Sequence, residues 1–277
     1  MEYSVHIMDI NIKIQDLKSI IKEHAPLLIA YSGGVDSTLL AVLTRETIGA
    51  EHMHCVLVDG PEVPRRAVTA AINQSEYLKI PLTVREGVPF SRDLQKTNPH
   101  DRCRHCKLGT YTILKQIADD TGCTYIADGA NASDLGEHRP GIEAFSSCGV
   151  IHPFIMAGIT KQDIRDIAKS MDLPFWDKPS SACLYSRIPY GEEITDEKLR
   201  MIEKGEELLS DIGIRQARVR HHGLIVRIEV LPEEMEKILI QKDTVHTFFQ
   251  NLGFLYVTLD LKGYRSGSMD EVLKLSS

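Results

Sequence analysis

The sequence Ser32-Gly33-Gly34-Val35-Asp36-Ser37 follows a continuous apolar run at 27–30 and precedes apolar residues at helical spacing over 38–43. A short continuous apolar run is typical of a strand buried on both faces. Glycines let the backbone approach a phosphate without a Cβ clash, and the amides at a helix start point toward an anion. The order of strand, glycine turn and helix therefore predicts a phosphate-binding loop.

Ser32 and Ser37 would add hydroxyl donors to this loop. A carboxylate beside a phosphate is anomalous unless it serves Mg²⁺ or caps the turn, and Asp36 is expected to do one of these. The loop is neither a Walker A loop, which needs a lysine, nor a dinucleotide fingerprint, which needs a third glycine. The candidate phosphate-binding residues are Ser32, Gly33, Gly34, Asp36 and Ser37.

Strand and helix patterns alternate through the first two thirds of the chain. Further strands are predicted at 53–58, 81–85, 125–127 and 151–155, and helices at 9–24, 64–78, 107–120 and 160–171, the last with Thr160 and Asp163 as a capping box. Such alternation predicts an α/β fold with a doubly wound parallel sheet. Ligands of such sheets bind at the carboxyl ends of the strands, where glycine and aspartate cluster here.

The pattern changes near residue 178. A helix is predicted at 195–209, strands at 215–220 and 224–230, a helix at 232–249 and a strand at 255–259. We therefore expect two domains: a nucleotide-binding domain over 1–188 and a smaller α+β domain over 189–277 for substrate or oligomer contacts, with the active site between them.

Composition restricts the class of protein. Of 277 residues, 43% are hydrophobic and 26% charged, which excludes whole-chain disorder. The net charge of −7 lowers the expectation of nucleic-acid binding. No stretch approaches the roughly 20 apolar residues of a membrane helix, and the N-terminal residues have no signal-peptide core. We expect a cytoplasmic homo-oligomer without membrane contact.

The six cysteines should be reduced in the cytoplasm, so their spacing matters. Cys103 and Cys106 form a CxxC pair, expected on a loop that runs into a helix, and can reach one metal. A redox pair, half a zinc site and cluster ligands all remain open. Cys183, near the domain boundary, is the third candidate, and three thiolates would leave one corner of a 4Fe–4S cluster open. Packing is expected for Cys55 and Cys123, and Cys148 remains undecided.

Two arginines in the C-terminal region alternate on one predicted strand. Arg218 and Arg220 would point to one face and suit a phosphate through forked hydrogen bonds. Arg187 and Arg265 are further candidates. For any single arginine, a solvated charged face is the competing interpretation.

The phosphate-loop sequence resembles the SGGxDS signature of the PP-loop ATP pyrophosphatases. This resemblance implies cleavage of ATP to AMP and pyrophosphate with adenylation of a substrate oxygen. Val58 and Gly129, at the ends of the second and fourth predicted strands, resemble the nucleotide contacts of that family.

A more specific resemblance extends over nearly the whole chain. The motifs that carry it lie at 32–37, 101–107, 151–154, 183–191, 219–223 and 263–267. Together they resemble the LarE family, the sulfur transferases that build the nickel-pincer nucleotide cofactor. The resemblance implies ATP and Mg²⁺, and a mononucleotide substrate, pyridinium-3,5-biscarboxylic acid mononucleotide, whose carboxylate is adenylated and converted to a thiocarboxylate.

The LarE resemblance implies one of two sulfur sources. In one branch the cysteine matching Cys183 gives up its own sulfur; in the other, three cysteines hold a 4Fe–4S cluster that carries a sulfide. The CxxC makes this chain resemble the second branch, with Cys103, Cys106 and Cys183 as cluster ligands and Cys183 and Asp36 as catalytic residues. Tyr185 departs from the pattern, which has a small residue there.

The LarE resemblance also implies a substrate phosphate at Arg218 and Arg220, and a metal near Glu206 and Glu229. Two other functions remain as alternatives. One is a PP-loop enzyme that thiolates tRNA with a 4Fe–4S cluster, which the acidic charge disfavours. The other is a zinc-stabilised nucleotide sensor without turnover. The sulfide donor is not indicated by the sequence.

Overall fold

The computed structural model describes residues 2–87, 90–136, 140–179 and 183–272. The chain forms two compact units. The first comprises Met1–Gly60, Arg65–Phe90 and Asp101–Ser181, and the second Pro61–Pro64, Ser91–His100 and Ala182–Ser277. The domains 1–188 and 189–277 stay a prediction.

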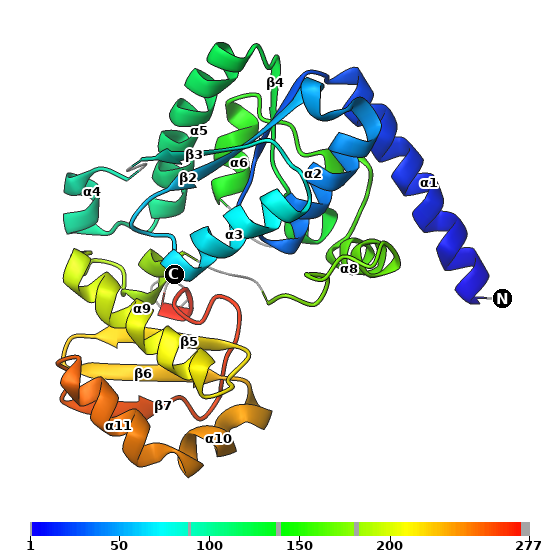
Figure 1. Cartoon of the computed structure of the whole chain (residues 1–277). Helices are drawn as coiled ribbons and strands as arrows, with labels where there is room; N and C mark the ends of the chain where they lie inside the picture. Colours follow the sequence, from blue (N-terminus) through cyan, green and yellow to red (C-terminus); the bar gives the residue numbers. More distant parts are fainter. Residues whose placement is uncertain (1, 88–89, 137–139, 180–182, 273–277) are drawn as a thin grey trace. The chain divides into compact units, whose positions relative to one another are not determined.

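A parallel sheet lies at the centre of the first unit (Figure 1). Its strand order is β3-β2-β1-β4. The strands are β1 (Leu27–Ala30), β2 (Met53–Asp59), β3 (Leu82–Glu86) and β4 (Tyr125–Ala127). Every neighbouring pair is parallel, so the carboxyl ends of the strands meet at one edge. The predicted α/β fold with a parallel sheet is confirmed.

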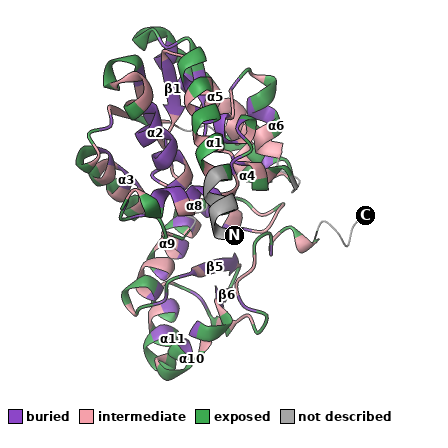
Figure 2. Cartoon of the chain, turned by 90° about the vertical axis from the view of Figure 1, so that its right-hand side faces the viewer, coloured by how far each residue is buried: buried purple, intermediate pink, exposed green. Residues whose placement is uncertain are grey.

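Helices cover the sheet of the first unit. They are α1 (Glu2–Glu23), α2 (Val35–Ile48), α3 (Arg65–Tyr77), α5 (Arg102–Thr121), α6 (Pro140–Ser147), α7 (Pro153–Met156) and α8 (Lys161–Ser170), with short 3₁₀ helices η1 (Ala50–His52) and η2 (Ala132–Gly136). Leu114 of α5 and Phe145 of α6 pack with Leu28 and Val56 in one buried cluster. The first three residues of β1 and most of α2 are buried (Figure 2), so the intervening loop is held from both sides.

The predicted capping box of α8 is confirmed. The Thr160 hydroxyl accepts a hydrogen bond from the Asp163 amide, and the Asp163 carboxylate accepts one from the Thr160 amide. Two orphan amides at the helix start are satisfied in this way, which fixes where α8 begins.

The predicted strand at 151–155 is wrong. Only Ile151 pairs with β4, through an isolated parallel bridge to Ala127. Pro153 has no N–H for a ladder and its fixed φ suits the first turn of a helix, and α7 begins there. α6 was not predicted from the sequence.

The second unit contains a three-stranded sheet of order β5-β6-β7. Its elements are α4 (Arg92–Thr97), η3 (Leu184–Arg187), α9 (Asp196–Asp211), β5 (Ala217–His222), β6 (Ile225–Val230), η4 (Pro232–Glu234), α10 (Met235–Ile240), α11 (Lys242–Asn251) and β7 (Tyr256–Leu259). β5 and β6 pair antiparallel, and β6 and β7 parallel. The helix predicted over 232–249 is divided instead, with a break at Gln241 between α10 and α11.

None of the helices in the described residues is long and apolar enough to cross a bilayer.

Candidate functional site

The phosphate loop joins β1 to α2, as predicted. The Ser32 and Ser37 hydroxyl oxygens lie 3.0 Å apart, and the Ser32 amide donates to the Ser37 hydroxyl at 3.1 Å. Gly34 is the N-cap of α2 and accepts the first helical hydrogen bond from Thr38. Hydroxyls and helix-start amides therefore converge on the turn, which is the arrangement that binds a phosphate.

Glycine is required at position 33 for two reasons. Its φ is +69°, in the left-handed region that L side chains rarely adopt. A Cβ there would lie 2.4 Å from the Cβ of Ala71 on α3. The close approach of α3 leaves the loop backbone no room for a side chain.

Asp36 faces a lysine that the sequence did not identify. Its carboxylate forms an ion pair with Nζ of Lys161, the first residue of α8. Burial raises the pKa of Asp36, and the charge of Lys161 opposes that rise. The predicted Mg²⁺ ligand is thus a carboxylate that already holds a cationic partner, and a metal ion would take the place of Lys161.

A second lysine reaches the same loop. Nζ of Lys178 donates a hydrogen bond of 3.0 Å to the carbonyl oxygen of Gly33. Lys178 is half-buried, and burial lowers the pKa of its ammonium group. No local pattern could have indicated either lysine, because each lies more than 120 residues after its partner.

The carboxyl end of β4 lies against the phosphate loop. Gly129 packs on the backbone of the loop at Asp36 and Ser37. The preceding Asp128 is buried and accepts a hydrogen bond of 2.7 Å from Nδ1 of His152. Burial alone would raise the pKa of Asp128, but the hydrogen bond from His152 and the charges of Lys107 and His152 bring it below its ordinary value.

Val58, the other predicted nucleotide contact, lies near the carboxyl end of β2 and is half-buried. Both predicted contacts thus lie at the sheet edge that also carries the loop.

Cys103 and Cys106 lie in the first turns of α5, so the predicted loop is wrong: the helix begins at Arg102, directly after Asp101. Residues three apart on a helix are neighbours on one face. Cys103 is exposed and Cys106 half-buried. Cys183 is exposed and precedes η3 in the second unit. Among the residues that the structure describes, no three His, Cys, Asp or Glu side chains come together as a metal site.

Arg218 and Arg220 lie on β5, as predicted, but both are buried, so the alternative of a solvated charged face does not hold for them. Arg218 stacks on the ring of Tyr264, with 5.1 Å from its guanidinium carbon to the ring centroid. Nη2 of Arg220 donates to Glu229 at 2.7 Å and to Ser268 at 2.9 Å. Nε of Arg220 is buried and has no hydrogen-bond partner among the described residues.

Arg187 and Arg265 also have carboxylate partners. Arg187 is fully buried and donates to Glu206 from Nε at 2.7 Å and from Nη2 at 3.2 Å. Its Nη1 donates to the carbonyl oxygen of Cys183 at 3.1 Å. Arg265 is half-buried and pairs with Glu271. Glu206 and Glu229, for which the LarE resemblance implies a nearby metal, each pair with an arginine here.

Packing in the core was predicted for two of the three remaining cysteines, and the structure agrees. Cys55 and Cys123 are buried. Cys148 is half-buried, in the turn after α6.

Comparisons with known proteins support the interpretation of residues 32–37 as a phosphate-binding loop. The family model described as NAD synthase matches residues 12–104, which include the phosphate loop. An uncharacterised protein of Synechocystis is 37% identical over 94% of this chain and 98% of its own length. An uncharacterised protein of Methanocaldococcus jannaschii is 31% identical over 92% of this chain and 98% of its own.

A relative with an assigned activity matches over the same extent. The pyridinium-3,5-bisthiocarboxylic acid mononucleotide synthase of Lactiplantibacillus plantarum is 31% identical over 257 residues, which are 93% of each chain. The match therefore includes both compact units.

Proposed function

Since this chain belongs to the LarE family of pyridinium-3,5-bisthiocarboxylic acid mononucleotide synthases, we propose that it adenylates a carboxylate of pyridinium-3,5-biscarboxylic acid mononucleotide and replaces the adenylate with sulfur. The chain is an ATP-dependent sulfurtransferase of the PP-loop type. The observation that carries the proposal is the phosphate loop, in which the Ser32 and Ser37 hydroxyls meet at 3.0 Å at the start of α2.

The first half of the reaction forms an acyl-adenylate. A carboxylate oxygen of the substrate attacks the α-phosphorus of ATP, a new P–O bond forms, and the bond to the β-phosphate breaks to release pyrophosphate. Ser32, Gly33, Gly34 and Ser37 bind the phosphates in this proposal. Asp36 holds Mg²⁺, and Val58 and Gly129 contact the adenosine. The hydroxyls, amides and carboxylate of the loop fit this charge distribution.

The substrate phosphate is assigned to Arg218 and Arg220, with Arg187 and Arg265 of the same unit as further candidates. The buried Nε of Arg220 supports this assignment, because a donor without a partner costs free energy that a phosphate oxygen would recover. Ala substitution of Arg218 or Arg220 should weaken binding of the mononucleotide and leave ATP binding nearly intact.

For the sulfur we propose that Cys103, Cys106 and Cys183 are three ligands of a 4Fe–4S cluster. The two thiols on one face of α5 fit two corners of such a cluster, and Cys183 is exposed and supplies the third ligand. When bound, the cluster would carry the sulfide that becomes the thiocarboxylate sulfur. The chain's own residues bind ATP and the mononucleotide and orient the carboxylate toward the α-phosphorus. The competing assignment makes Cys183 a sacrificial sulfur donor.

Product analysis tests the adenylation. Incubation with ATP, Mg²⁺ and the mononucleotide should yield AMP and pyrophosphate. ADP and orthophosphate as products would refute the proposal, and so would pyrophosphate release that is independent of the mononucleotide.

The sulfur assignment has its own test. Anaerobically purified protein should contain iron and acid-labile sulfide, and Cys183 should keep its mass after turnover. A loss of roughly 34 Da at Cys183, the mass of H₂S lost from an activated thiol, would replace the cluster with the sacrificial assignment. A cytoplasmic location and a homo-oligomer complete the proposal.

A further inference from the structure

Three polar side chains outside the phosphate loop form a chain of hydrogen bonds. Nδ1 of His152 lies 2.7 Å from the Asp128 carboxylate, and Nε2 of His152 lies 2.9 Å from the Ser146 hydroxyl oxygen. We propose that Ser146 is a nucleophile, activated by His152 and Asp128, that attacks the carbonyl carbon of an activated carboxylic ester. This activity is separate from the proposed sulfur transfer and does not depend on it.

The two ring nitrogens of His152 have different roles. An ionised carboxylate only accepts hydrogen bonds, so Nδ1 carries the proton toward Asp128 and Nε2 presents its lone pair to the Ser146 hydroxyl. Burial opposes ionisation of Asp128, but the hydrogen bond from His152 and the charges of Lys107 and His152 hold the pKa of Asp128 below its ordinary value. A base that is oriented by a carboxylate toward a hydroxyl is the arrangement of an activated serine nucleophile.

Burial differs along this chain of hydrogen bonds in the sense that catalysis requires. The side chains of Asp128 and His152 are only 10% and 11% exposed, whereas Ser146 is exposed. Asp128 is held further by the Ala130 amide, which donates to the carboxylate at 3.1 Å. The orienting carboxylate and the base are therefore shielded from water, and the hydroxyl is open to a ligand.

The neighbouring Ser147 on α6 resembles Ser146 in all but one contact. Both serines are exposed, and each hydroxyl donates to a carbonyl oxygen of the same helix, at 2.9 Å for Ser146 and 2.7 Å for Ser147. Among the described residues, a histidine lies within hydrogen-bond distance of Ser146 and not of Ser147. Ser147 is therefore an internal control for the effect of the base.

The proposed reaction conserves atoms and charge. The Ser146 oxygen forms a bond to the carbonyl carbon while its proton passes to Nε2 of His152. The bond from the carbonyl carbon to the leaving alkoxide or phenoxide then breaks, and His152 returns the proton to that group. The resulting acyl-serine is hydrolysed by a water molecule that gives its proton to the same nitrogen. Asp128 stays ionised throughout and stabilises the imidazolium.

Labelling with an alkyl fluorophosphonate tests the nucleophile, because the reagent forms a stable phosphonate ester with an activated serine and loses fluoride. The full-length protein is labelled without ATP or mononucleotide, so the result does not bear on sulfur transfer. Peptide mass spectrometry should find Ser146 labelled at least about tenfold faster than Ser147, since a positioned base contributes about 10²–10⁴-fold. Equal rates at the two serines, or labelling of neither, would overturn the proposal.

Two variants separate the base from a purely structural partner. The glutamine of His152→Gln can donate to Asp128 but cannot take up a proton, so the rate of labelling at Ser146 should fall at least about tenfold. Ser147→Ala is the matched control and should leave the Ser146 rate unchanged. An unchanged Ser146 rate in folded His152→Gln would contradict the role of the base. The comparison of Ser146 with Ser147 in wild-type protein does not depend on the folding of any variant.

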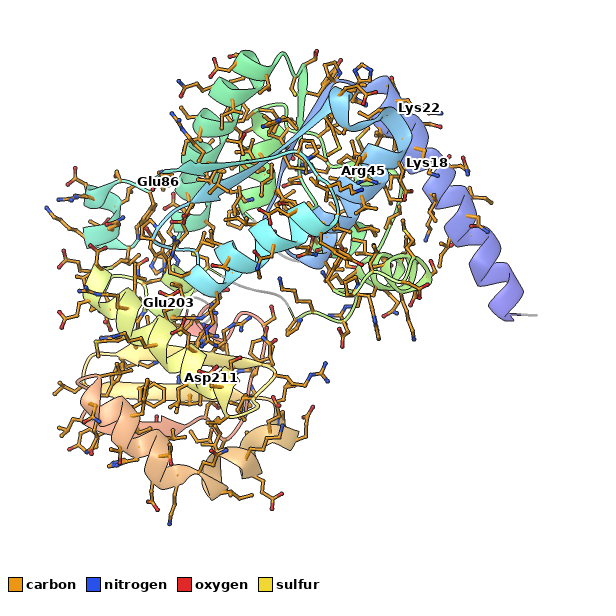
Figure 3. All side chains as sticks on the ribbon, in the orientation of Figure 1. Lys18, Lys22, Arg45, Glu86, Glu203 and Asp211 are labelled. Atoms are coloured by element: carbon orange, nitrogen blue, oxygen red, sulfur yellow. The ribbon has the colours of Figure 1, made fainter. Side chains whose placement is uncertain are left out.

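Hydrolysis of p-nitrophenyl acetate tests the complete cycle. Wild-type protein should release p-nitrophenolate faster than Ser146→Ala, and acid-quenched samples should carry an acetyl group at Ser146. Lys22, exposed on α1 (Figure 3), reports acylation of amines by the reagent, which should be the same in both proteins. Equal ester hydrolysis by wild type and Ser146→Ala would contradict the activity.

Discussion

Gly129, which follows β4, packs against the backbone of Ser37 in the first turn of α2: a Cβ on Gly129 would lie 2.8 Å from the Ser37 amide nitrogen and 3.1 Å from the Asp36 carbonyl carbon. The 2.8 Å distance is shorter than a Cβ keeps from a backbone atom, so a side chain at position 129 would force the backbone to shift. The end of β4 therefore sets the position of the first turn of α2.

Gly129→Ala should displace the phosphate loop. We expect a loss of about 1–3 kcal/mol in the free energy of unfolding from overpacking and at least a tenfold (about 1.4 kcal/mol) weaker affinity for ATP. Urea unfolding and calorimetric titration measure the two effects.

Gly122→Ala is the control for Gly129→Ala. Gly122 ends α5 with φ +72°, and nothing lies within 4 Å of an added Cβ. This variant should lose about 1 kcal/mol of stability from backbone strain alone and bind ATP normally. Normal ATP binding by Gly129→Ala would contradict the contact.

The fully buried Arg187 and its half-buried partner Glu206 should be coupled. Removal of Arg187 leaves the partly exposed carboxylate of Glu206 without its cation, so Arg187→Met should cost about 2 kcal/mol of the free energy of unfolding. The double variant Arg187→Met with Glu206→Gln should lose at least about 1 kcal/mol less than the sum of the single losses. Additive losses in a urea-unfolding cycle would mean that the two groups act independently.

The pKa of Asp128 predicts a pH dependence of stability. Because the folded pKa lies below 3.8, ionised Asp128 stabilises the fold above pH 3.8, and this contribution is lost as the pH falls from 3.8 toward the folded pKa. The stability difference between wild type and Asp128→Asn should therefore be largest at pH 7 and shrink below pH 3.8.

Urea unfolding at several pH values measures the Asp128 effect. The exposed carboxylate of Asp119 on α5 provides the control, and Asp119→Asn should change stability by less than about 0.5 kcal/mol. A difference for Asp128→Asn that does not change with pH would contradict the coupling to His152.

The cysteines should differ in their rates of alkylation. In iron-free protein, iodoacetamide should modify the exposed Cys103 and Cys183 at least about tenfold faster than Cys55, because Cys55 is buried and burial raises its pKa. Peptide mass spectrometry over time gives the rates, and unfolding in urea should remove the difference. Fast modification of Cys55 in the folded protein would contradict its burial.

Local signals were sufficient to predict the centre of the first unit. An apolar run, a glycine turn and a helical pattern lie next to each other in the chain and form β1, the loop and α2 as expected. The capping box of α8 is likewise a four-residue pattern. The predicted strand at 151–155 was wrong because its apolar residues continue past Ile151, the one residue that bridges to β4, and beyond Pro153.

The polar environment of the site could not be predicted in the same way. Lys161 and Lys178 reach the loop only through the packing of α8 and the segment after it. The spacing of Arg218 and Arg220 indicated a shared face, but not the carboxylate of Glu229 that one of them meets. Such pairs depend on which elements become neighbours, and a single sequence contains no pattern for that.

The second unit is assembled from three separate stretches of chain. Asn98, from the middle stretch, donates from Nδ2 to the carbonyl oxygen of Pro189 at 2.7 Å and accepts from the Gly191 amide at 3.0 Å. During synthesis on the ribosome, some ninety more residues must be added after Asn98 before these partners exist. A gene fragment that encodes only the last third of the protein would lack this connection. The second unit of this chain is therefore not encoded by one continuous stretch of the gene.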